Sequence, residues 1–265
     1  MRIHRPLNNR NIYRFNGRTF DQVPGALAAI SVGAADAVWG INAAHQVFRS
    51  NGRTFDLVPG VLLRTISASW GPVWGIDAAN QIFRFNGRTF DQIPGTLVSI
   101  AVGVGIRDKV WGVNAAQEVF EFNGRTFDQI RGAVLSAVFA GGGIPVWGID
   151  AANQIFRYGR GFHQVPGFLT SIAVGVGRVS QDQFVWGINA ANEVFRFDDR
   201  SDRFQLVPGL LTSIVAHSES EIWGINAANQ IFRFNGRTFD QAPGNLASIA
   251  VGKQNNGESH VWGLF

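Results

Sequence analysis

The sequence contains no cysteine and only one methionine, two tyrosines and two lysines among its 265 residues. The absence of cysteine excludes disulfide bonds and thiolate metal sites. No Asn-X-Ser/Thr sequon occurs, residues 1–10 lack the apolar run of a secretory signal, and no apolar stretch is long enough to span a bilayer. We therefore expect a cytoplasmic protein with no membrane insertion.

Charged residues are also scarce, at 16% of the chain, with 23 basic and 19 acidic side chains. The arginines are spread along the whole sequence, and an aspartate follows many of them in the recurring TFDQ segment. Nucleic-acid binding by so dispersed a charge would be weak and strongly dependent on salt. We therefore expect no nucleic-acid partner and keep this function only as a third alternative.

The most informative feature present is an internal repeat. Trp-Gly pairs recur at intervals of 35 to 39 residues, and a fixed period of this length predicts stacked or radial repeats. The period is unbroken from residue 11 to residue 265, so we expect a single domain over 1–265 in which residues 1–10 form a leader. The pairs begin at Trp39, Trp74, Trp111, Trp147, Trp186, Trp223 and Trp262.

Each repeat has the pattern of four short strands and no helical spacing. In one unit the strands, here named A to D, are expected at Leu97–Gly103, Val110–Asn114, Glu118–Phe122 and Arg125–Ile130. An Asn-Gly dipeptide between strands C and D predicts a two-residue type I′ hairpin. In six units a proline follows strand D, which predicts that the outer strand ends there.

A four-stranded antiparallel unit of this size cannot bury both of its faces alone, whereas radial packing buries each face on a neighbour. We therefore predict an all-β, seven-bladed β-propeller. The N-terminal part supplies only strands C and D, and the C-terminal part only strands A and B, so we expect these two parts to close one blade together. Antiparallel order places the B–C turns and D–A connectors on one side, and the C–D hairpins and A–B loops on the other.

The B–C turn is the main candidate for a binding site, because its Gly-apolar-Asn/Asp-Ala-Ala pattern hardly varies while the A–B loops differ freely. Its polar residue either caps the turn alone or caps it and contacts a ligand; the sequence leaves both alternatives open. Leu264 and Phe265 replace the pattern in the composite blade, where no such site is expected. The polar turn residues are Asn42, Asp77, Asn114, Asp150, Asn189 and Asn226.

Two further repeated residues have alternative roles. Each tryptophan of a Trp-Gly pair either packs between blades or forms a platform for a sugar ring, with the glycine and alanines leaving room for a methyl or acetyl group. The strand C arginine either makes interblade hydrogen bonds or binds sugar hydroxyls, and Glu121 replaces it in one blade. The arginines are Arg14, Arg49, Arg84, Arg157, Arg196 and Arg233.

Catalysis has little support in the sequence. The five histidines occupy unrelated positions in the repeat, and no Gly-X-Ser-X-Gly elbow is present. The glycine-rich segments lead into strands rather than into a helix N-terminus, which argues against a phosphate site. We expect a protein that is not an enzyme, with no catalytic residue, metal or cofactor.

At these residues the sequence resembles the tectonin repeats of slime-mould and fungal tectonins and of fish-egg lectins, most of all those of the mushroom tectonins. The resemblance rests on the spaced combination of Trp-Gly, Asn/Asp-Ala-Ala and an apolar-Phe-Arg strand, and it covers the chain after the leader. It implies a multivalent β-propeller lectin that recognises O-methylated glycans of bacteria or nematodes in innate defence.

The resemblance places polar sugar contacts at the six turn residues, with support from the adjacent tryptophan and the strand C arginine. Glu121 and the shortened hairpin around Gly159 depart from the pattern. The implied partners are glycans with methylated sugars, and a homo-oligomer stays an open alternative. The rival hypothesis is a scaffold propeller that binds another protein through the variable A–B loops. The implied sugar-binding set is Trp39, Asn42, Arg49, Trp74, Asp77, Arg84, Trp111, Asn114, Trp147, Asp150, Arg157, Trp186, Asn189, Arg196, Trp223, Asn226 and Arg233.

Overall fold

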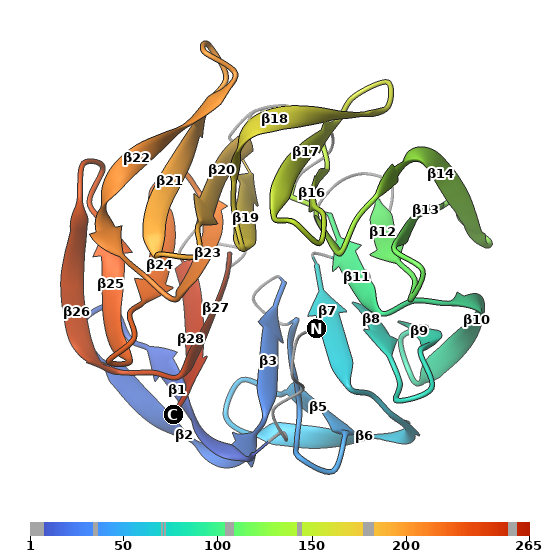
Figure 1. Ribbon diagram of the computed structural model, residues 1–265. Helices are drawn as coiled ribbons and strands as arrows, with labels where there is room; N and C mark the ends of the chain where they lie inside the picture. The colour runs from blue at the N-terminus through green and yellow to red at the C-terminus, as the bar shows by residue number, and fades with distance from the viewer. Residues whose placement is uncertain are drawn as a thin grey trace.

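The computed structural model describes residues 8–33, 37–69, 71, 73–103, 109–141, 145–176, 183–253 and 259–265. They form seven sheets of four antiparallel strands arranged around a central axis (Figure 1). This is the seven-bladed β-propeller that the repeat predicts. Within these residues, no helix is long and apolar enough to cross a membrane.

In every blade strand A lies nearest the axis and strand D lies outermost (Figure 1). Blade I contains β3 (Ala29–Val32), β4 (Val38–Ile41), β5 (Gln46–Ser50) and β6 (Phe55–Leu62). Blade II contains β7 (Thr65–Ala68), β8 (Val73–Ile76), β9 (Gln81–Phe85) and β10 (Phe90–Thr96). Blade III contains β11 (Ser99–Val102), β12 (Val110–Val113), β13 (Glu118–Phe122) and β14 (Phe127–Val134).

The second half of the ring follows the same order. Blade IV contains β15 (Ala137–Phe139), β16 (Trp147–Ile149), β17 (Gln154–Tyr158) and β18 (Phe162–Phe168). Blade V contains β19 (Ser171–Val176), β20 (Gln183–Ile188), β21 (Glu193–Asp198) and β22 (Arg203–Leu210). Blade VI contains β23 (Ser213–Ser218), β24 (Glu221–Ile225), β25 (Gln230–Phe234) and β26 (Phe239–Asn245). The composite blade contains β27 (Ser248–Lys253), β28 (Ser259–Leu264), β1 (Arg10–Phe15) and β2 (Phe20–Leu27).

The composite blade closes the ring as predicted. Strand β1 pairs with β28 in antiparallel register, and Ile12 lies opposite Leu264. Beyond this pair the Asn11 N–H donates to the Phe265 carbonyl at 2.9 Å, and the Phe265 N–H donates to the Asn11 carbonyl at 3.0 Å. Residues from the two parts of the chain therefore share one sheet, and the pairing of β1 with β28 leaves no open strand edge where the two parts meet.

Strand D does not end at the proline, contrary to the sequence prediction. In the composite blade Ile12 pairs with Val23 but Asn11 pairs with Ala26, so Pro24 and Gly25 form a bulge and the strand continues to Leu27. Proline has no N–H to donate, and a bulge is one of the places in a sheet that accepts it. The other six blades have a register shift at the same place in their strand C–strand D pairing, which skips two residues in blades II, IV, V and VI and three residues in blades I and III.

The type I′ prediction for the C–D hairpin is also wrong. Phe15 pairs with Phe20 across a loop of four residues, and of the Asn16-Gly17 pair only the glycine has a positive φ. The Asn16 side-chain oxygen accepts hydrogen bonds from the backbone N–H groups of Arg18 and Thr19, both at 2.9 Å. The asparagine thus closes the loop with its side chain, which makes the left-handed conformation at this residue unnecessary.

The core lies between blades and is built on the repeated tryptophans, each of which is at most 1% exposed. The Trp147 ring meets two aromatic rings of blade V nearly edge to face, Phe197 at 4.7 Å and Phe204 at 5.6 Å. Such pairs contribute about 0.5–1.5 kcal/mol beyond the area they bury. The packing role predicted for the tryptophans is therefore present, and in this conformation no indole face is open to a sugar.

The glycine after each tryptophan makes room for a leucine, not for a ligand. A Cβ atom on Gly187 would lie 2.3 Å from Cδ1 of Leu169, which begins the connector into the same blade. Every Trp-Gly glycine has the same neighbour, a buried leucine at 2.3–2.4 Å. The expectation that this glycine leaves space for a methyl or acetyl group is therefore wrong, because the leucine fills that space.

One interblade contact departs from the repeat. Ser50 stands where other blades have phenylalanine or tyrosine, and Trp262 packs against Phe55 at 5.7 Å. Beside it lies His260, which is 5% exposed, with its ring 5.4 Å from the indole and neither ring nitrogen hydrogen-bonded to a described residue. Burial, together with the charge of Arg14, lowers the pKa of His260 from 6.5 to about 4.

This histidine predicts a loss of stability in acid. Between about pH 6.5 and pH 4 the unfolded chain binds a proton at His260 and the folded chain does not, so stability falls as the pH falls. The full shift corresponds to about 3 kcal/mol. Urea denaturation at several pH values should show a smaller acid loss for His260→Phe than for the unmodified protein. Equal losses in both proteins would contradict the assignment.

Candidate functional site

The B–C turn is a capped turn in six blades. In blade V the Asn189 side-chain oxygen accepts hydrogen bonds from the N–H groups of Ala191 at 3.0 Å and Glu193 at 2.9 Å. The other five turns have the same two bonds at 2.8–3.0 Å, from either asparagine or aspartate. The polar residue therefore caps the turn in all six blades, whether or not it also contacts a ligand. The paired alanines of the turn remain exposed.

The residue after the two alanines fixes the next connector. Asn153 has a φ of 63°, and its carbonyl accepts the N–H of Leu169 at 2.9 Å. Equivalent residues in the other five turns have φ values of 62–66° and make the same bond to the buried connector leucine. Asparagine tolerates this left-handed conformation better than most residues do. The turn sequence therefore varies little from blade to blade in large part because the turn and its connector need these residues to fold.

The turns differ in the polar atoms that they leave free. The Asn42, Asn114, Asn189 and Asn226 amides donate to the side chain four residues on, at 2.6–2.8 Å. In blades II and IV, the second carboxylate oxygen of Asp77 or Asp150 has no partner among the described residues. The side chain of Asn153 likewise has no partner there.

The strand C arginine lies at the other end of the blade from the turn. Arg49 pairs with Trp39, three residues before Asn42 on strand B, which is a distance of roughly 10 Å along the strand. Its guanidinium lies 5.5 Å from the Trp39 ring centre, and the five other strand C arginines lie 5.3–5.9 Å from their own tryptophans. The structure therefore does not bring the predicted turn residue, indole and arginine together in one site.

The departure at Glu121 is explained by a reversed ion pair. Lys109 at the start of strand B pairs with Glu121 on strand C in blade III. Blade VI has the opposite arrangement, in which Glu221 accepts a hydrogen bond from Arg233 at 2.8 Å. Both ion pairs join the start of strand B to strand C. Strand C therefore has a glutamate where its strand B partner is a lysine, and an arginine where that partner is a glutamate.

A groove of about 400 Å³ lies between blades IV and V on the turn side. Its rim carries Asn153 and the Asn189-Ala190-Ala191 turn, and its wall carries Phe168, which is 63% exposed. Pro166 of the bulge and two aromatic rings of blade V, Phe195 and Phe204, complete the apolar lining. Of the predicted sugar-binding set, only Asn189 lines this groove.

Sequence reasoning missed the groove because its wall comes from the outer strand. Phe168 occupies the position just before the buried connector leucine, and this position alternates between small, polar and large apolar residues from blade to blade. The variation itself was a usable signal, since a packing residue would have kept one character. The residues at this position are Ala26, Leu62, Thr96, Val134, Phe168, Leu210 and Asn245.

The variable A–B loops were the basis of the scaffold hypothesis. Of six such loops, five, at 33–37, 103–109, 141–145, 175–183 and 252–260, contain segments that lie outside the described residues. The sixth, at 217–221, is described throughout and joins β23 to β24 by a short turn.

The ring of Trp-Gly blades and the capped turns define a propeller built from tandem repeats of one kind. The Tectonin domain model matches residues 7–69, 62–196 and 170–264. The chain therefore belongs to the Tectonin family. No curated protein sequence matches it.

Two solved structures that superpose on this chain are distant from it in sequence. Yeast RCC1 (Prp20), solved with bound Kap60, superposes with a TM-score of 0.76 at 9% identity, over 98% of this chain and 90% of that chain. Human WBSCR16 gives a TM-score of 0.73 at 9% identity, over 97% of this chain and 98% of that one. At such identities the likeness concerns the fold alone.

Proposed function

We propose that this protein is a multivalent lectin that binds O-methylated sugars in the grooves between neighbouring blades on the turn side. The groove between blades IV and V carries the proposal, since it combines an apolar wall with polar groups at its rim. Membership of the Tectonin family supports a lectin, and the resemblance to mushroom tectonins extends the proposal to defence against bacteria or nematodes.

The chemistry of the groove suits a methylated sugar. A methoxy group can rest on Phe168 and Pro166, while the free side chain of Asn153 meets a neighbouring hydroxyl. Burial of one methyl group contributes only about 0.8 kcal/mol, so a single groove binds weakly. Asn189 and the equivalent turn residues stay in the proposed site, at the rim of the groove. The tryptophans are buried and the strand C arginines lie at the other end of the blade, so we assign both to the support of the fold.

Weak sites become effective through repetition on a rigid disc. Six turns of the same construction face one side of the ring, and the composite blade lacks the turn because Leu264 is buried and Phe265 pairs with Asn11. Several sites that engage one glycan-coated surface can raise the apparent affinity by about 10² to 10⁴. The protein should therefore agglutinate glycan-coated particles although it binds free monosaccharides feebly.

A triple variant tests the turn side. Gln117→Gly, Asn153→Gly and Asn192→Gly remove three polar side chains while glycine keeps the positive φ of each turn. We expect agglutination of particles coated with mono-O-methylated hexoses to weaken by at least about tenfold. Unmethylated parent sugars should inhibit less well than the methylated ones.

The matched control changes three exposed hairpin arginines on the opposite side, Arg18→Gln, Arg88→Gln and Arg125→Gln. This control should agglutinate the particles as the unmodified protein does. Equal activity of the two triple variants, or no preference for methylated over parent sugars, would reject the proposal.

A further inference from the structure

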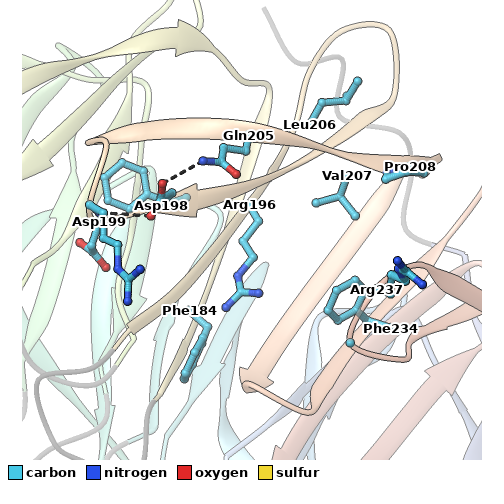
Figure 2. Close-up of a pocket in the computed structure, with 13 residues that line it drawn as sticks. Phe184, Arg196, Asp198, Asp199, Gln205, Leu206, Val207, Pro208, Phe234 and Arg237 are labelled. Atoms are coloured by element: carbon cyan, nitrogen blue, oxygen red, sulfur yellow. Dashed lines mark hydrogen bonds between the residues drawn. The ribbon is translucent and has the colours of Figure 1, made fainter.

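A second groove, of about 560 Å³, lies between blades V and VI on the hairpin side, opposite to the turns. Figure 2 shows Arg196 of β21 in this groove, with Phe184 below it and with Phe234 and Arg237 of blade VI across from it. Arginines from facing blades therefore line one cavity, which Arg200 and the two carboxylates of Asp198 and Asp199 also line. The size of the groove falls in the range that small-molecule sites occupy.

Arg196 and Arg237 lack the close ionic partners that strand C arginines have in the grooves on either side. Arg157, one blade earlier, is held by Asp199 at 3.0 Å and by Asp202 at 3.4 Å. Arg233, one blade later, pairs with Glu221 at 2.8 Å. Arg196 has only Glu219 at 4.0 Å, and Arg237 has no side-chain partner among the described residues.

The cross-strand neighbour of Arg196 is also exceptional. Most blades place an aspartate opposite the strand C residue, whereas blade V places Gln205 there. The aspartates at this register position are Asp21, Asp56, Asp91, Asp128 and Asp240, and blade IV has His163. Gln205 instead donates to Asp198 at 2.8 Å, so it adds no negative charge beside the guanidinium.

We propose that this groove binds a carboxylate-bearing sugar, that is, a uronic acid residue. Its carboxylate lies between Arg196 and Arg237, because a guanidinium presents paired N–H donors that match a carboxylate. Its ring lies along Phe184 and Pro208, and the amide of Gln205 and the ionised Asp198 are placed for its hydroxyls. The Ser201 hydroxyl donates to Asp198 and lowers the pKa of that carboxyl below its usual value.

This site is independent of the turn-side grooves, so it takes a different ligand on the other face of the disc. Its affinity should fall as salt is added, because exposed arginines attract the carboxylate through a screened charge interaction. The neutral parent sugar should bind at least about tenfold more weakly, since the two charge-assisted hydrogen bonds are lost.

Calorimetric titration of the whole protein with glucuronate, glucose and inorganic phosphate tests the proposal. Glucuronate should bind more tightly than either of the others. Arg196→Gln and Arg237→Gln should each weaken glucuronate binding by at least about tenfold. Gln205→Asp, which introduces the carboxylate that five other blades have at this position, should weaken it as well, and Arg88→Gln in the hairpin of blade II should not.

Absence of glucuronate binding, phosphate binding as tight as glucuronate binding, or an equal loss in Arg88→Gln would overturn the proposal. Agglutination of particles coated with methylated hexoses by Arg237→Gln should equal that of the unmodified protein. The turn-side lectin and the acidic-sugar site can thus fail or succeed separately.

Discussion

The double variant Asn11→Cys and Phe265→Cys should form an intramolecular disulfide and raise the free energy of unfolding by about 5 kcal/mol. The two residues exchange both backbone hydrogen bonds, and such a pair has a Cα separation of about 5.5 Å, which a disulfide can bridge. The cross-link would close a loop of about 250 residues, and long loops give the largest entropic gain. The protein has no native cysteine that could compete.

Urea denaturation before and after reduction measures the gain, and each single-cysteine variant controls for the loss of the native side chain. Both positions are exposed, so the substitutions themselves should change the unfolding free energy little. Cysteines that stay reduced under oxidising conditions, or that link separate molecules, would contradict closure of the ring by the composite blade.

Trp147→Ala should lower the free energy of unfolding by about 3–5 kcal/mol. The indole is fully buried, and its removal leaves a cavity against Phe197 and Phe204 between two blades. Phe168→Ala in the same blade is the matched control, because Phe168 is 63% exposed and its truncation should cost far less. Urea denaturation of both variants would decide the point, and similar losses would mean that the indole does not stabilise the interface between blades.

The sequence was sufficient to predict the ring because the period and the incomplete terminal repeats are one-dimensional features. The B–C turn was also predictable, since asparagine and aspartate cap tight turns by local bonds. The local predictions were wrong where two different turn conformations suit the same residues. Asn16-Gly17 suits a type I′ turn, but an asparagine side chain that accepts two N–H groups closes a four-residue loop instead.

The candidate site was less predictable, because the spacing of residues in the sequence does not show at which end of the blade each side chain lies. Trp, Asn/Asp and Arg recur together in every unit, yet the arginine lies on the hairpin side and the indole between blades. The turn-side groove is formed by Phe168 of one blade and the Asn189 turn of the next, residues that belong to different repeats. Only the packing of neighbouring blades shows that they meet.

The most direct test of the account is a crystal of this protein soaked with a mono-O-methylated hexose. We expect sugar in grooves on the turn side, with its methoxy group against Phe168 between blades IV and V, and none beside Leu264 in the composite blade. Sugar stacked on a Trp-Gly indole, or lodged only in the central channel, would contradict it.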